Sequence, residues 1–218
     1  MAKSFFDFFP TPQYLSMPSV GLDISERAVR MIEFRGNKKH IQLARFSEEL
    51  LPSGTIVNGQ IKNSEALVKV LRTMKKKFGL KFVAVTLPEE KAYVFKTEIP
   101  QVPDDEIREA IGFKIEENVP ISGTESVFEF ESTRVGDDKI VADVSVVPLA
   151  VVTAFTDMLR NAGLVPIAYR IESQAIAKSV IPAGDDRSYL IANIGISRTA
   201  LSIVSEGRVQ FSSTVSVG

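Results

Sequence analysis

VGLDISERAVRMIEFRGNKKHIQLARF, residues 20–46, is the stretch on which the expected fold depends. Its apolar runs at residues 20–24, 28–34 and 41–46 predict three strands. The segments between these runs are polar or contain glycine, which is typical of tight turns. The stretch therefore predicts a meander of three antiparallel strands.

A helix and a buried strand are expected after this meander. Asn63 or Ser64 should cap the helix, and Gly79 should end it. Between these residues, apolar side chains recur at helical spacing, at Leu67, Val70, Leu71, Met74 and Phe78. The continuous apolar run 82–87 predicts a buried strand. Because strand, helix and strand follow one another, we expect a crossover connection, parallel pairing and an α/β subdomain.

The hydrophobic period changes several times within residues 91–163. A strand is expected at 92–99, and a helix from Pro103 to the residue before Pro120. A hairpin with its turn at 136–138 follows, and then a helix at 149–161. These elements predict a small inserted α+β domain of about 70 residues.

The remaining residues are expected to complete one lobe and begin another. A strand and a helix within residues 164–185 return the chain to the first sheet, so residues 18–90 and 164–185 are assigned to a discontinuous first lobe. Residues 186–218 should begin a second lobe with three strands that repeat the opening meander, at 189–194, 199–204 and 209–215. Because three strands leave a sheet edge unpaired, this lobe is expected to be truncated and the chain to be a fragment.

Residues 1–17 are an N-terminal extension with many aromatic side chains, namely Phe5, Phe6, Phe8, Phe9 and Tyr14. Asp7, Pro10 and Pro12 interrupt it, so it lacks the continuous apolar core of a signal peptide. Two interpretations stay open. The aromatic side chains pack on the domain, which we favour, or they contact a partner or a membrane surface.

Composition excludes several classes of function. The net charge of -1 removes the electrostatic attraction on which non-specific nucleic-acid binding depends. The absence of cysteine excludes disulfides and thiolate chemistry. His40 is the single histidine of the sequence, which argues against a zinc site. His40 is better interpreted as a solvated turn residue, and the three lysines at 75–77 as the last turn of a helix, where they complement its dipole.

The two predicted hairpins carry the candidate site. Asp23 and Ser25 in the first, and Asn193 and Gly195 in the second, stand where the leading strand passes into its turn. A turn of small residues presents N–H groups and hydroxyls toward a phosphate, and an aspartate beside it can anchor a hydrated magnesium ion. The alternative is that these are ordinary turn formers and that Arg30 is a surface strand arginine. Glu172 is either a water-positioning carboxylate or an ordinary helix-start residue.

The order of elements resembles the actin-like superfamily and, within it, the PilM and FtsA families. The resemblance is carried by residues 21–24 with 29–33, by residues 99–103 with 113–120, by residues 162–166, and by residues 191–195 with Thr199. It implies an actin-like (ribonuclease H-like) first lobe and binding of ATP and Mg²⁺ by the intact protein. The implied nucleotide-binding residues are Asp23, which is also implied to face the metal, Ser25, Glu26, Arg30, Asn193, Gly195, Ser197 and Thr199.

Two residues depart from the pattern of these families. Ser25 stands where a glycine is usual, and Asn193 stands where an aspartate is usual. An asparagine can neither neutralise a metal ion nor accept a proton from water, so we expect binding without significant turnover and assign no catalytic residue.

The PilM resemblance also implies a function. It predicts a cytoplasmic scaffold, peripheral to the inner membrane, that binds the N-terminal peptide of a PilN-type protein in a groove between the first lobe and the insert. Other pilus inner-membrane proteins are further expected partners. The alternatives are an FtsA-like division filament protein, the cytoplasmic domain of a type II secretion protein, and an ATPase or sugar-kinase relative.

Overall fold

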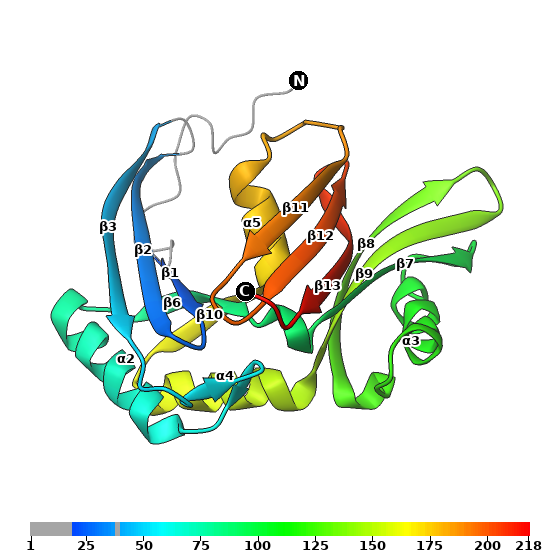
Figure 1. Ribbon diagram of the computed structural model, residues 1–218. Coiled ribbons are helices and arrows are strands. Elements are labelled where there is room, and N and C mark those ends of the chain that lie inside the picture. The colour runs from blue at the N-terminus through cyan, green and yellow to red at the C-terminus, as the bar shows by residue number, and fades with distance from the viewer. Residues whose placement is uncertain (1–18, 38–39) are drawn as a thin grey trace.

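The computed structural model describes residues 19–37 and 40–218 (Figure 1). The aromatic residues of the N-terminal extension, and Lys38 in the turn predicted between the second and third strands, lie outside the described residues. None of the helices in the described part of the chain has the length and hydropathy that a bilayer span requires.

The largest sheet has five strands in the order β10-β6-β1-β2-β3. Strands β1, β6 and β10 run parallel, as the crossover prediction required, and β2 and β3 follow β1 as an antiparallel meander. The meander strands are longer than the sequence predicted. The bounds are β1 (Ser19–Ile24), β2 (Ala28–Asn37), β3 (His40–Leu50), β6 (Phe82–Leu87) and β10 (Val165–Ile171).

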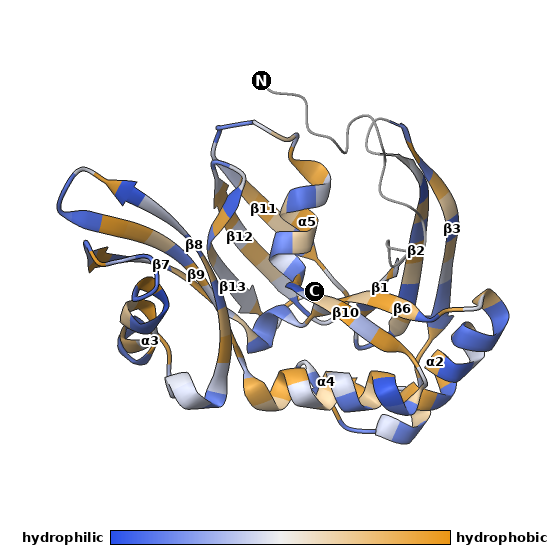
Figure 2. Cartoon of the chain, turned by 180° about the vertical axis from the view of Figure 1, so that it is seen from behind, coloured by the Kyte–Doolittle hydropathy of each residue, from blue (hydrophilic) through white to orange (hydrophobic). Residues whose placement is uncertain are grey.

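Helices α2 (Ser64–Phe78) and α4 (Leu149–Asn161) pack along this sheet (Figure 1). Asn63 caps α2 as predicted, accepting a hydrogen bond from the amide of Ala66 at 3.0 Å, and Gly79 ends it with a left-handed φ of 66°. Figure 2 shows β1, β6 and β10 as mostly hydrophobic, whereas much of α2 is hydrophilic. The loop before α2 contains a short hairpin that was not predicted, β4 (Ile56–Val57) with β5 (Gln60–Ile61).

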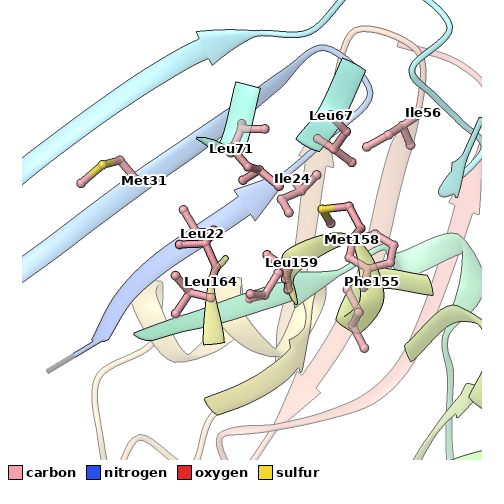
Figure 3. Close-up of a cluster of buried hydrophobic side chains, with 14 of the residues drawn as sticks. Leu22, Ile24, Met31, Ile56, Leu67, Leu71, Phe155, Met158, Leu159 and Leu164 are labelled. Carbon is pink, nitrogen blue, oxygen red and sulfur yellow. The ribbon is translucent and has the colours of Figure 1, made fainter. Parts of the chain in front are cut away.

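The main core lies between the sheet and these helices (Figure 3). It joins side chains from β1, α2 and α4, including Leu22, Ile24, Leu67, Leu71, Phe155, Met158 and Leu159. The predicted insert of residues 91–163 contains α4, yet the buried residues of α4 belong to this core. The buried side chains of α4 therefore pack with the first sheet, although the helix also contacts β8 and β9.

The rest of the predicted insert forms a separate core. Strands β7 (Tyr93–Pro100), β8 (Ser126–Val135) and β9 (Lys139–Pro148) pair in the order β7-β9-β8, and α3 (Ile107–Asn118) packs on one face through Ile107, Ile111 and Ile115. The predicted hairpin is confirmed, but the predicted start of the helix at Pro103 is wrong. Residues 104–106 instead form a turn, closed by a 3.0 Å bond from the Glu106 amide to the Pro103 carbonyl.

The second predicted meander is confirmed. Helix α5 (Glu172–Val180) leads to an antiparallel sheet of β11 (Tyr189–Ile194), β12 (Thr199–Ser205) and β13 (Arg208–Val215). In both views this sheet lies between the first lobe and the insert (Figures 1 and 2). One face buries Val204 and Val209 in the main core, whereas the other exposes a cross-strand row of Leu190, Ile203 and Phe211.

Candidate functional site

The carboxyl ends of β1, β6 and β10 meet at one edge of the first sheet, because the three strands run parallel. In open α/β sheets, this edge is where ligands bind. Polar residues lie at or just after these strand ends. They are Asp23 in β1, Thr86 in β6, Glu89 and Glu90 in the 3-10 turn η1 (Glu89–Lys91), and Glu172 at the start of α5. We call these residues, together with the hairpin turns 25–27 and 195–198, the strand-end site.

Asp23 is held by two neighbours. The Thr86 hydroxyl donates to Asp23 Oδ1 at 2.9 Å, and Arg30 Nη1 donates to Asp23 Oδ2 at 3.3 Å. The hairpin register places Asp23 opposite Arg30, so the pairing follows from the turn that the sequence predicted. Arg30 also binds Glu48 at 2.5 Å. The Asp23 carboxylate is thus already engaged with one cation.

The first turn is closed by its own serine. The Ser25 hydroxyl donates to the Ala28 carbonyl at 3.1 Å and accepts from the Ala28 amide at 3.3 Å, while the Ser25 amide donates to the same carbonyl at 3.0 Å. The next residue, Glu26, connects the two hairpins. Its carboxylate accepts a 2.9 Å bond from the Ser197 hydroxyl in the second turn and a 2.7 Å bond from the Asn58 amide. The two hairpin turns therefore meet.

The second turn needs a glycine at its first position. The Gly195 amide donates to the Arg198 carbonyl at 2.8 Å, and a Cβ on Gly195 would lie 2.9 Å from that carbonyl oxygen, which is too close. Asn193, just before the turn, donates through Nδ2 to Glu172 Oε1 at 2.9 Å. The Thr199 hydroxyl donates to the Val217 carbonyl at 2.7 Å, so it ties down the last residues of the chain.

Arg198 is the central cation of the strand-end site. Its guanidinium donates to Glu172 Oε2 at 2.9 Å and also binds Glu90, and all three side chains are about four-fifths buried. Burial raises the pKa of the Glu172 carboxyl; Arg198 opposes this shift, while the charges of Asp23 and Glu89 add to it. Glu90 Oε2 is buried without a hydrogen-bond partner among the described residues.

Glu89 holds the start of α5. It is 3% exposed, and its two oxygens accept bonds from the Ser173 amide at 2.8 Å and the Ser173 hydroxyl at 3.0 Å. The residue before the helix, Ile171, has no side chain that could cap it, so a carboxylate from another element takes that role. Glu89 thereby fixes the helix turn that carries Glu172.

Sequence reasoning missed four residues of this site, Thr86, Glu89, Glu90 and Arg198. One signal was available, since a Thr and two Glu residues flank the end of a strand predicted to be parallel. Arg198 was also readable as a cation in a turn of small residues, but nothing in the sequence indicated which carboxylates it binds.

The site suits a phosphate better than a metal ion. Its turns carry backbone amides and the Ser197 hydroxyl, and the guanidinium groups of Arg30 and Arg198 bind its carboxylates. Residue 193 brings a neutral amide, and Arg198 already binds the carboxylates of Glu90 and Glu172. Within residues 19–37 and 40–218, no group of three or more acidic, histidine or cysteine side chains could hold a metal ion.

A polar groove of about 410 Å³ separates the insert from the first lobe. One wall is the face of β8 and β9 that carries Glu129, Asp143 and Ser145, and the other wall includes Gln174 and Lys178 of α5. The walls are joined where Gln174 Nε2 donates to the Ser145 hydroxyl at 2.7 Å. Arg208, the first residue of β13, closes one side by binding Asp143 Oδ2 at 3.1 Å.

Comparison with known proteins decides the family. A sequence profile described as "Type IV pilus assembly protein PilM" matches residues 21–218. The chain belongs to this PilM family. No curated protein matches the chain.

Two solved structures resemble this PilM-family chain. The "PilM-PilN type IV pilus biogenesis complex" matches with a TM-score of 0.78 at 20% identity, over 92% of this chain and 62% of the other. The cytoplasmic domain of EpsL, an inner-membrane component of the type II secretion system of Vibrio cholerae, matches with a TM-score of 0.61 at 12% identity, over 90% and 70%. At these identities the likeness shows the fold alone. The chain spans less than two thirds of the length of the first of these structures.

The predicted actin-like α/β fold is thus confirmed, as is the predicted relationship to PilM. The strand-end site lies where the two predicted phosphate hairpins meet. Binding by the individual residues stays a prediction.

Proposed function

We propose that this PilM-family chain is part of a cytoplasmic scaffold of type IV pilus assembly, which binds the N-terminal peptide of a PilN-type inner-membrane protein. The family assignment and the likeness to a PilM–PilN complex support this proposal. Binding to this inner-membrane partner would also hold the scaffold at the inner membrane.

The observation that carries the proposal is the polar groove between the insert and the first lobe. Its volume is within the range of pockets that bind small ligands or a few side chains. Glu129, Asp143 and Ser145 line one wall, and Gln174 and Lys178 line the other, so both walls offer groups that can bond to a peptide backbone.

The proposal includes nucleotide binding at the strand-end site of the intact protein. A phosphate group would take its donors from the Arg30 guanidinium, from the Ser197 hydroxyl, which here donates to Glu26, and from backbone amides of the two turns. Asp23, Glu26, Asn193 and Gly195 would shape the site, while the hydroxyls of Ser25 and Thr199 bond within the protein. Significant turnover is not part of the proposal, because Asn193 supplies no carboxylate to activate water.

Peptide binding is tested by fluorescence anisotropy with a labelled synthetic peptide that has the N-terminal sequence of a PilN-type protein. Gln174→Trp places a bulky ring in the groove, and Gln60→Trp, at an exposed position on β5, is the matched control. We expect saturable binding that weakens at least about tenfold in Gln174→Trp and is unchanged in Gln60→Trp, as a loss of about 1.4 kcal/mol would give. Equal affinities for both variants would place the peptide elsewhere, and the absence of saturation at high micromolar concentrations would overturn the proposal.

A further inference from the structure

Two carboxylates from different elements bind one guanidinium at the strand-end site, and a third carboxylate lies near one of them. Glu172 begins α5 and binds Arg198 at 2.9 Å, and Glu90 in η1 also binds Arg198. Asp23, at the end of β1, lies close enough to affect the ionisation of Glu172. Arg198 is 19% exposed, so its charge is balanced mainly by these groups and little by water.

We infer that Arg198 is a built-in cation that takes the place of a divalent metal ion at the strand-end site. A phosphate-bearing ligand would then bind there without metal. The claim that a phosphate-bearing ligand binds without metal deepens the nucleotide part of the proposed function and rests on it. The claim that Arg198 takes the place of a metal ion concerns the protein alone.

The geometry favours a guanidinium over a metal ion. Magnesium requires six oxygen ligands at about 2.0–2.1 Å in octahedral arrangement. Here Asn193 turns its amide nitrogen toward Glu172, so it donates a hydrogen bond and offers no oxygen to that side. Asp23 is occupied by Thr86 and Arg30. Glu172 and Glu90 are then the carboxylates left for a cation, and the planar fork of Arg198 binds both.

The carboxylates around the site outnumber its guanidinium groups. Arg30 is paired with Asp23 and Glu48, and Arg198 is paired with Glu172 and Glu90. Removing the Arg198 charge without removing the carboxylates would leave Glu172 and Glu90 uncompensated, with Glu89 and Asp23 nearby. Such a group either takes up protons or attracts a different cation.

Metal ions alone test the inference in the 218-residue chain, without nucleotide. Thermal unfolding is followed with Mg²⁺ or Mn²⁺ against sodium chloride of equal ionic strength, and Mn²⁺ binding is counted by electron paramagnetic resonance. We expect no specific shift in wild type. In Arg198→Met we expect a lower melting temperature in sodium chloride and a metal-specific rise of about 3–6 °C at tenfold excess over the Kd.

The charge-conserving variant Arg198→Lys is the control and should gain no metal response. Arg198→Gln, which is shorter and polar, repeats the test if the methionine variant does not fold. Specific Mn²⁺ binding by wild type would overturn the inference. So would a folded neutral variant that loses stability but gains no metal response, since Arg198 would then only hold the hairpin in place.

The nucleotide half is tested separately in the full-length protein, by comparing ATP binding in EDTA with binding in Mg²⁺. Equal affinities are expected, and binding that requires Mg²⁺ would contradict the inference. If ATP binds under neither condition, the nucleotide proposal fails. The metal-alone result still decides the role of Arg198.

Discussion

Replacing Glu89 with alanine should strongly destabilise the first lobe, because this buried carboxylate is the cap of helix α5. The change removes the acceptor of both the Ser173 amide and the Ser173 hydroxyl, and Ser173 itself is only 4% exposed. A buried donor without an acceptor costs about 1–3 kcal/mol, and a negative charge at a helix start contributes about 0.3–1 kcal/mol. The release of the carboxylate from its buried position offsets part of this sum.

The net loss should be about 3 kcal/mol in the free energy of unfolding, which corresponds to about 6–12 °C in melting temperature for a chain of this length. Urea denaturation of Glu89→Ala measures the loss. Glu65→Ala is the matched control, since Glu65 is an exposed acid in the first turn of α2, and it should cost no more than about 0.5 kcal/mol.

A double-mutant cycle with Ser173→Ala measures how much of this loss acts through the Ser173 hydroxyl, since the Ser173 amide is retained in both backgrounds. If the two side chains act through their hydrogen bond, the loss in Glu89→Ala should be smaller when Ser173 is already alanine. Additive losses would show that the Ser173 hydroxyl contributes nothing through Glu89, whereas a loss in Glu89→Ala below about 1 kcal/mol would refute the capping argument.

Four further predictions concern other parts of the structure. Asn63→Ala should lower the free energy of unfolding by about 1 kcal/mol in urea denaturation, because it removes the cap of α2. Phe155→Ala should cost about 3–5 kcal/mol in the same assay, since its ring is 1% exposed in the main core. Ile111→Ala, in the separate core of the insert, should speed hydrogen exchange in α3 but leave α2 protected. Burial raises the pKa of Glu172 above its ordinary value of 4.5, so its ionisation costs stability as pH rises from 4.5 through the raised value. Glu172→Gln should therefore lose less stability than wild type between about pH 5 and pH 8, when both are compared by urea denaturation.

Local sequence patterns were sufficient to predict most elements. The cap at Asn63, the stop at Gly79 and the two meanders depend on residues close together in the chain, and each is found where it was predicted. The helix predicted from Pro103 begins later because residues 104–106 form a turn, which the same residues allow equally well. The packing of α4 could not be predicted for a different reason. Its apolar face is visible in the sequence, but the core that it joins is a property of the assembled sheet.

At the candidate site, too, contacts within one hairpin were predictable from the sequence and contacts between distant segments were not. The pairing of Asp23 with Arg30 follows from the register of one hairpin, and sequence reasoning had singled out both residues. The contacts of Arg198 with Glu90 and Glu172 join residues 108 and 26 positions apart, so they depend on how the two lobes meet. Turn chemistry predicted where the hairpins lie. It could not predict that a guanidinium would stand between them.

Helix α5 is the element that the strand-end site and the groove share. Its first turn carries Glu172, which binds Arg198, and two positions later Gln174 binds Ser145 across the groove. Lys178, further along the same helix, lines the groove. Because nine residues of regular helix move as a unit, a ligand that displaces Arg198 from Glu172 can affect a peptide in the groove only as far as it changes the position of α5. The coupling free energy between the two sites therefore cannot exceed the change in the contact energy of α5 between its two positions. By linkage, each ligand must change the affinity for the other by the same factor.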